Sequence, residues 1–332
     1  MLIGVVAAAV TAVAMVVLIG RLAGFSKVRD VLAEAHPEWL IVCVLGQMLV
    51  FAGYAGAFRW TVRADDGPTV ALGLSIRVVL ASFAATQVFS FAGIGGLAVM
   101  YLVLRRYERD AQAAAVRLIG LNTAVYLVFG VIGWFAAAVA LGIGDAPLGM
   151  TVPWLIAIPI VMLAARWFSA PNRVTRWTEA RCGVIRRALA TGVGATAWVR
   201  RRLTDTGPRL LFCWAACYWI GDIASLWAAL NAFGGHPGLV ALTAAYTTGY
   251  LVQSLPIPLI ATAGVDTATV LLLRTVGVPL DVALLGVVTH RVFAFWIPLV
   301  PGSVFALTLL RLNFDRDDGH SDDSLEREPR LL

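Results

Sequence analysis

Long apolar runs, separated by short polar turns, set the pattern of this chain of 332 residues. A helix needs about 20 apolar residues to cross the ~30 Å hydrocarbon core of a bilayer. Runs of that kind, or large parts of one, cover residues 2–20, 39–58, 111–141, 154–168, 210–230 and 282–310. The pattern therefore predicts an all-α polytopic integral membrane protein with about six to eight spanning helices.

Two other apolar stretches are interrupted, at 90–96 (SFAGIGG) and at 253–266 (QSLPIPLIATAGVD). Proline lacks a backbone donor and biases the preceding residue away from helix, and glycine adds a flexible joint. Broken backbone is tolerated in a bilayer only where protein or a water-filled cavity satisfies its polar groups. We therefore expect residues 253–266 to line an internal cavity, the alternative being a plain surface loop. The hinge candidates are Gly93, Gly95, Gly96, Pro256, Pro258 and Gly264.

The two interrupted stretches match each other. Gly264 follows Gly95 at the same interval along the chain as Arg274 follows Arg105. Each break is followed by a short apolar piece, an arginine, a polar turn and a long apolar run. This predicts two pseudo-repeats, at about 39–141 and 210–311, of inverted topology, a plan that transporters use. Whether each broken stretch is a re-entrant hairpin or a full pair of spans stays open.

Composition and charge place the chain in the membrane. Hydrophobic residues make up 60% and charged residues 14%, whereas soluble domains average roughly 25% charged. The segment 170–209 carries nine arginines against two carboxylates and is typical of an amphipathic helix lying on a membrane surface. Basic connections stay cytoplasmic, which places this loop and both termini on the cytoplasmic side of the cell membrane. Arg21, Lys27 and Arg29 would then lie outside, contrary to that rule.

One transmembrane domain is expected over residues 1–311, followed by a charged, disordered cytoplasmic tail at 312–332. The run at 2–20 has no basic residues before it, which favours a retained helix over a cleaved signal. Basic residues at the ends of apolar runs act as interfacial anchors. The predicted anchors are Arg59, Trp60, Arg105 and Arg274.

Ionisable residues inside the apolar runs are the candidates for function, because a buried charge must pair or face water. One interpretation is a polar cavity that takes a lipid headgroup, with arginine on phosphate. The other is a set of structural ion pairs, such as Asp222 or Asp266 with Arg291. Arg117, like Arg59 and Arg105, can snorkel to the interface, and His290 is interpreted as a packing or hydrogen-bonding residue. The cavity candidates are Asp266, Arg291, Asp222, Arg77, Gln87 and Gln253.

Known catalytic motifs are missing from the sequence. It contains no HExxH, GxSxG, P-loop or GxGxxG pattern. Its four cysteines have neither disulfide-framework nor zinc-site spacing. We therefore expect no enzyme activity, no cofactor, no metal and no nucleic-acid partner.

Several short motifs, in order and spacing, resemble the transmembrane domain of lysylphosphatidylglycerol synthases, a flippase-like family. They are Phe58-Arg59-Trp60, Gly93–Gly96 with Tyr101–Arg105, Tyr218–Asp222, Pro256–Asp266, and Arg291 with Phe295–Pro298 and Gly302. Similar proteins tend to have a proline where this chain has Phe91-Ala92, and a glutamate where it has Asp266. We expect the family's soluble aminoacyl-transfer domain to be absent. The resemblance implies lipid translocation or handling without lipid aminoacylation.

The leading hypothesis is a flippase-like transporter that moves a phospholipid, or another lipid with a polar headgroup, across the cytoplasmic membrane. One alternative is an accessory membrane subunit for a lipid-modifying or glycosyl-transferring enzyme. The other is an intramembrane enzyme acting on a polyprenyl or phospholipid headgroup. The expected partners are membrane lipids, including anionic headgroups, together with a second copy of the chain or a partner enzyme.

Overall fold

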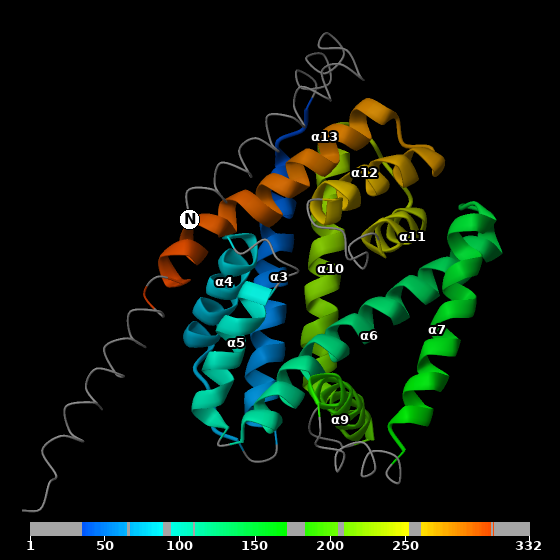
Figure 1. Ribbon diagram of the computed structural model, residues 1–332. Coiled ribbons are helices and arrows are strands. Elements are labelled where there is room, and N and C mark those ends of the chain that lie inside the picture. The colour runs from blue at the N-terminus through cyan, green and yellow to red at the C-terminus, as the bar shows by residue number, and fades with distance from the viewer. Residues whose placement is uncertain are drawn as a thin grey trace, which may run out of the picture.

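The computed structural model describes residues 35–64, 67–88, 94–108, 110–170, 183–204, 209–251, 260–306 and 308. All regular secondary structure in these residues is helical (Figure 1). The predicted helix at 2–20, the tail at 312–332, and the candidates Gly93, Gln253, Pro256 and Pro258 lie outside them. Gln87 lies in a helix, but its side chain is likewise outside the described set.

Five helical segments in the described part of the chain are long and apolar enough to cross a membrane. They are α3 (Glu38–Arg63), α6 (Ala111–Ile143), α7 (Leu148–Phe168), α10 (Arg209–Ala232) and the continuous run Leu280–Ala306. That run contains α13 (Leu280–Arg291) and a π-helical turn, η3 (Val292–Trp296). The all-α class is as predicted, and the apolar helices indicate an integral membrane protein.

The described helices form two sets in the same order, each with two short helices between two long ones. In the first set α4 (Leu72–Val88) and α5 (Ile94–Tyr107) lie between α3 and α6. In the second, α11 (Leu239–Tyr250) and α12 (Ile260–Thr275) lie between α10 and the run Leu280–Ala306. At 1.5 Å per residue, the 14 residues of α5 and the 12 of α11 extend only about 21 and 18 Å. Each of these short helices alone is shorter than a ~30 Å core, and it packs against its neighbour, so that α4 with α5 and α11 with α12 form two hairpins.

Glycines allow α3 and α10 to pack in direct backbone contact. A Cβ at Gly46 would lie 2.7 Å from the carbonyl oxygen of Gly221, and a Cβ at Gly221 would lie 2.6 Å from that of Gly46. Further along, a Cβ at Gly53 would lie 2.5 Å from the backbone nitrogen of Tyr218. Small residues are the usual means of close helix packing in membranes. These three glycines define the α3/α10 glycine seam.

The helices of the seam run antiparallel, so the two hairpins open at opposite ends of the molecule. The backbone N–H of His36, just before α3, donates to the carbonyl of Ala232, at the end of α10. The α11/α12 hairpin starts and finishes at this end, where Val278 and Val282 surround Gly235. The α4/α5 hairpin starts and finishes at the other end of α3, beside α6. Figure 1 shows the two hairpins on either side of the α3/α10 pair.

Each set also packs its last helix against the hairpin of the other set. Helix α6 contacts α11, where the rings of Phe129 and Tyr250 lie 5.3 Å apart. The run 280–306 contacts α4, where Phe295 lies 6.1 Å from Phe83. There, a Cβ on Gly302 would overlap the α4 backbone. The two sets therefore interlock into a single core.

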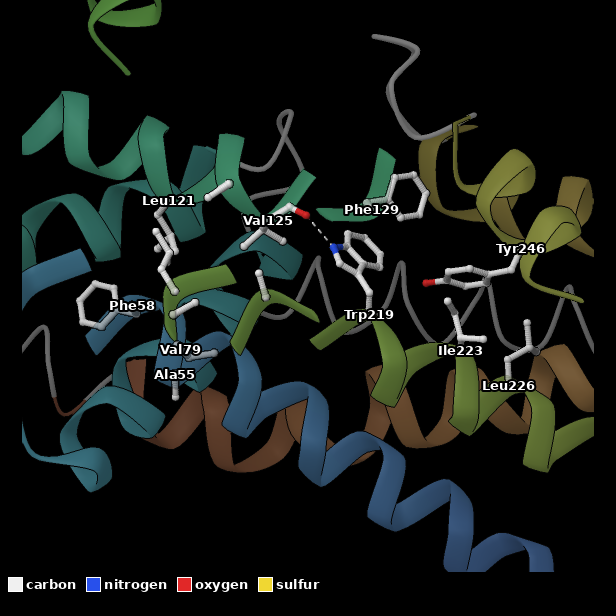
Figure 2. Close-up of a cluster of buried hydrophobic side chains, with 14 of the residues drawn as sticks. Ala55, Phe58, Val79, Leu121, Val125, Phe129, Trp219, Ile223, Leu226 and Tyr246 are labelled. Carbon is white, nitrogen blue, oxygen red and sulfur yellow. Dashed lines mark hydrogen bonds between the residues drawn. The ribbon is translucent and has the colours of Figure 1, made fainter. Parts of the chain in front are cut away.

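Trp219 of α10 lies at the centre of that core (Figure 2). Its indole N–H donates to the carbonyl of Val125 on α6 at 2.8 Å. Its ring lies 4.4 Å from that of Phe129 and 5.1 Å from that of Tyr250. A buried tryptophan needs a partner for its N–H, and here the partner ties α6 to α10.

Part of the arginine-rich segment forms helix α9 (Val184–Thr204), which packs along α6. Trp198 lies over Gly120, whose Cβ would come within 2.6 Å of the indole. The amide of Gln112 donates to the hydroxyl of Thr191 at 2.8 Å. Arg187 and Arg201 are exposed. One face of the amphipathic helix is therefore anchored to the core.

Three local predictions differ from the structure. Gly95, Gly96 and Gly264 lie within helices rather than at breaks. At Gly96 the reason is packing, because a Cβ would lie 2.5 Å from the carbonyl oxygen of Ser82 on α4. Arg59 and Trp60 do not close the second span either. Helix α3 continues one more turn to Arg63, whose guanidinium lies 5.0 Å from the Trp60 ring.

Candidate functional site

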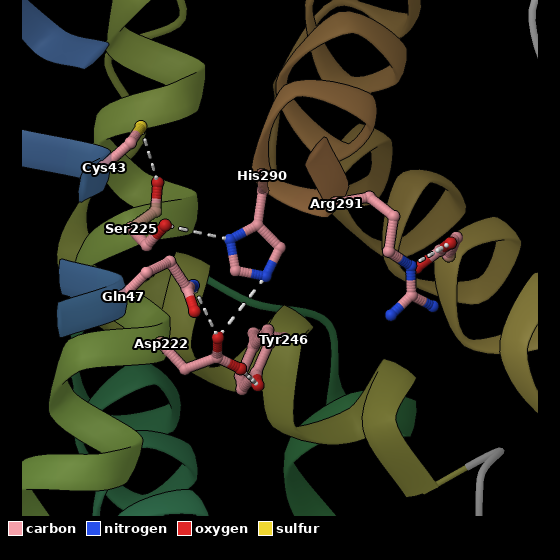
Figure 3. A network of polar contacts seen from close by, with 8 residues as sticks. Cys43, Gln47, Asp222, Ser225, Tyr246, His290 and Arg291 are labelled. Carbon is pink, nitrogen blue, oxygen red and sulfur yellow. Dashed lines mark hydrogen bonds and ion pairs between the residues drawn. The ribbon is translucent and has the colours of Figure 1, made fainter. Parts of the chain in front are cut away.

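The carboxylate of Asp222, in the middle of α10, receives polar groups from three other helices (Figure 3). The amide of Gln47 on α3 donates to Oδ1 at 3.0 Å. The hydroxyl of Tyr246 on α11 donates to Oδ2. The Nε2 atom of His290 on α13 lies 3.5 Å from Oδ1. A buried charge must find such partners in a membrane, and here they come from residues far apart in the chain.

His290 is held from its other side as well. Its Nδ1 atom lies 3.2 Å from the hydroxyl oxygen of Ser225, one turn from Asp222 on α10. The Sγ of Cys43 donates to the backbone carbonyl of the same serine at 3.3 Å. Only 12% of the His290 side chain and 13% of the Asp222 side chain are exposed. The imidazole thus bridges two fixed points on α10.

The next residue on α13 holds a second carboxylate. Nε of Arg291 donates to Oδ2 of Asp266, on α12, at 2.9 Å. The Asp266 side chain is 13% exposed and that of Arg291 is 26% exposed. The guanidinium also lies 5.8 Å from the ring of Phe295. Of the two pairings considered from the sequence, the structure therefore shows Asp266 with Arg291, while Asp222 takes His290.

Other predicted residues lie away from this cluster. Arg77 is exposed on α4, with its guanidinium 6.0 Å from the ring of Phe305. Arg105 and Arg274 are exposed in the last turns of α5 and α12, where a positive charge suits the helix dipole. The snorkelling interpretation of Arg117 is wrong. Its side chain is 10% exposed and forms an ion pair with Glu108 at 2.6 Å.

Arg117 is buried because its side chain caps the C-terminal end of α3. Its Nη1 donates to the carbonyl of Val62 at 3.2 Å, in the last turn of that helix. The first four N–H groups and the last four carbonyls of a helix have no partner within it, and side chains can supply one. The ion pair with Glu108 compensates the charge that this bond brings into the protein. The group is therefore structural.

The first helix set has a polar bridge at the matching place. The hydroxyl of Tyr54 on α3 donates to Oδ1 of Asn122 on α6 at 3.1 Å. Along the chain, Asp222 follows Tyr54 at the same interval as His290 follows Asn122. This bridge is thus formed by neutral groups in the first set, whereas the Asp222–His290 contact in the second set is formed by ionisable groups.

Sequence reasoning missed Gln47, Tyr246, Ser225 and Cys43 as parts of the cluster. Each looks like an ordinary residue of an apolar run, and their partners lie 24 to 182 residues away. One available signal was the separation of 68 residues shared by the Tyr54–Asn122 and Asp222–His290 pairs.

Comparison with known protein families gives one match. A family model described as the lysylphosphatidylglycerol synthase TM region matches residues 1–302. No curated protein and no solved structure matches the chain. The match covers both helix sets and the whole Asp222–Arg291 cluster.

Proposed function

We propose, from the premise that this chain belongs to the lysylphosphatidylglycerol synthase transmembrane family, that it moves a lipid with a polar headgroup across the membrane. The family and the apolar helices make it an integral membrane protein with a membrane lipid-related function. Translocation of a phospholipid, without chemical modification, is the more specific activity that we propose.

The observation that carries this proposal is the Asp266–Arg291 pair on the second hairpin and α13. Charged groups inside membrane segments are rare and mark substrate or ion pathways. The pair presents both signs of charge at 2.9 Å, as a zwitterionic headgroup does. Phosphate is a natural partner of guanidinium, and a carboxylate suits an ammonium group. A passing headgroup can therefore replace each partner of the pair in turn.

The two helix sets support the same function as an inverted repeat. Their hairpins open at opposite ends of the antiparallel α3/α10 pair. Many transporters place the substrate near the midplane, between two inverted repeats with broken helices. We propose that the two sets are related by a two-fold axis in the membrane plane, and that lipid crosses between them.

We place the α9 end of the molecule on the cytoplasmic side of the cell membrane. Arg187 and Arg201 are exposed on α9, and Arg105 and Arg106 are exposed at the end of α5. Excess lysine and arginine mark cytoplasmic loops. The exposed arginines would also attract anionic lipid to the inner leaflet, the side from which a headgroup would enter.

Reconstitution tests the proposal. The purified protein is placed in liposomes with fluorescent phosphatidylglycerol, phosphatidylethanolamine or phosphatidylcholine, and a membrane-impermeant reductant reports the leaflet of each lipid. We expect faster exchange between leaflets than in protein-free liposomes for at least one headgroup. The double variant Asp266→Asn with Arg291→Gln should fold but lose that acceleration.

The matched control is Arg274→Gln, which removes an exposed arginine from the end of the same hairpin helix, α12. It should translocate lipid as the wild type does. Liposomes in which no lipid of the panel exchanges faster than in the protein-free control would overturn the proposed function.

A further inference from the structure

We infer that the Asp222–His290 pair is a proton-binding site, and that proton passage through it drives lipid movement. This inference rests on the proposed function and adds its energy source. The pair is buried between α10 and α13 and is not needed to explain headgroup recognition by Asp266 and Arg291. A proton taken from water at one membrane face would bind the pair and leave to water at the other.

The uptake of one proton would balance the charges of the cluster. The cluster contains two carboxylates, Asp222 and Asp266, and one guanidinium, Arg291, so a neutral His290 leaves a net charge of −1. A net charge inside a membrane domain is unfavourable. Protonation of the imidazole brings the set to zero.

Apart from Asp266 and Arg291, the described groups around the pair are uncharged. They are Cys43 and Gln47 on α3, Tyr218 and Ser225 on α10, and Tyr246 and Tyr250 on α11. The amide of Gln47 and the hydroxyl of Tyr246 bond the Asp222 carboxylate without neutralising it. Of the three side chains that contact the carboxylate, His290 is the one that can take up a proton and become charged. His290 is therefore where the balancing charge can arise.

The geometry has a place for the proton. His290 Nε2 and Asp222 Oδ1 are 3.5 Å apart, beyond the 2.7–3.2 Å range of ordinary N–H···O hydrogen bonds. With its hydrogen on Nδ1, facing the Ser225 hydroxyl, a neutral imidazole turns the Nε2 lone pair toward the carboxylate. A proton on Nε2 converts this contact into a charge-assisted bond, which is shorter. Uptake would therefore draw α13 toward α10, and no covalent bond between heavy atoms would change.

The pair is connected to both helices of the second hairpin. Tyr246, on α11, binds the Asp222 carboxylate, and Asp266, on α12, binds Arg291, the neighbour of His290. A positive imidazole next to Arg291 repels the guanidinium and attracts the Asp266 carboxylate, which weakens the ion pair that holds α12. The π-turn η3 follows immediately, and such turns inside α-helices are frequent at functional sites. Protonation can therefore shift the hairpin that carries the headgroup pair.

The first helix set provides an internal control. Tyr54 and Asn122 form the matching bridge there, and neither is ionised near neutral pH. They join α3 to α6 without a proton to gain. If a polar bridge at this position served packing alone, neutral groups would serve in the second set too.

The test uses the full chain in liposomes that contain pyranine, a pH-sensitive dye, and fluorescent phosphatidylglycerol. A pH step of about one unit supplies a tenfold bias for one proton moved per lipid. We expect a leaflet imbalance of up to about tenfold in the direction of proton flow, with a matching pyranine signal. His290→Gln and Asp222→Asn should abolish both responses to the pH step. Tyr54→Phe and Asn122→Leu should keep them.

The outcomes separate this inference from the proposed function. Translocation that is equally fast with and without the pH step, with no pyranine signal, overturns proton coupling but keeps the transporter. No translocation under either condition counts against the proposed function, and the coupling falls with it. A response that persists in both second-set variants shows that the proton binds elsewhere. If Asp222→Asn does not fold, His290→Gln decides, because it leaves the bonds from Gln47 and Tyr246 in place.

Discussion

Removing one partner of the Asp266–Arg291 pair should destabilise the protein much more than removing both. At 2.9 Å and an effective dielectric constant of about 20, the attraction between the two charges is about 6 kcal/mol. Breaking a buried pair leaves one charge uncompensated, which costs about 3–5 kcal/mol. Because 26% of the Arg291 side chain is exposed, we expect each single variant, Asp266→Asn or Arg291→Gln, to lose about 3 kcal/mol.

The double variant removes both charges and should lose less than about 1 kcal/mol. The measurement is equilibrium unfolding in detergent, with SDS as denaturant and the intrinsic fluorescence of the 11 tryptophans as the signal. Arg274→Gln, on the surface of α12, should change the free energy of unfolding by less than about 0.5 kcal/mol. Losses that add in the double variant would refute the claim that these two charges compensate each other. Translocation then reports function separately, since we expect the double variant to be folded and inactive.

Further predictions concern the packing and the orientation of the helices. Gly53→Ala should destabilise the protein by about 1–3 kcal/mol, because its Cβ would lie 2.5 Å from the α10 backbone. Gly73→Ala, whose Cβ would meet no atom within 4 Å, should instead be neutral or stabilising when both variants are compared by thermal unfolding. Trp219→Phe should lose about 1–3 kcal/mol, since it removes a buried hydrogen bond between α10 and α6 together with part of a buried ring, and a melting temperature equal to that of wild type would contradict this. In a cysteine-free background, an impermeant thiol reagent on intact cells should label Gly238→Cys and miss Leu189→Cys, and the reverse pattern would invert the proposed orientation.

The long helices were predictable because their length and apolar content are local properties of the sequence. The residues at which the helices end were harder to predict. Helix α3 continues past Arg59 because a snorkelling arginine does not stop a helix, and its carbonyls find a donor in Arg117, which the sequence could not place. Gly96 was interpreted as a hinge because glycine is flexible, yet it serves close packing against Ser82. One residue type meets both needs, and only the neighbouring helix distinguishes them.

The charged residues of the site could be found from the sequence, but their partners could not. An ionisable residue in an apolar run is easily recognised, because burying its charge in a membrane is unfavourable. Asp222 depends on Gln47, which lies 175 residues away on another helix, and nothing local to either residue connects them. Tyr246 had the appearance of an ordinary core aromatic. His290 was interpreted as a packing or hydrogen-bonding residue, because a lone histidine gives no sign of which carboxylate it faces.

The α3/α10 glycine seam can form only after both of its helices have been synthesised. Of the two helices that it joins, α3 ends at Arg63 and α10 begins only at Arg209. At a synthesis rate of about 5–20 residues per second, the roughly 150 residues between them keep α3 waiting in the bilayer for about 7–30 s. During that interval the flat face made by Gly46 and Gly53 has no native partner, and it can pair with any other helix that presents small residues.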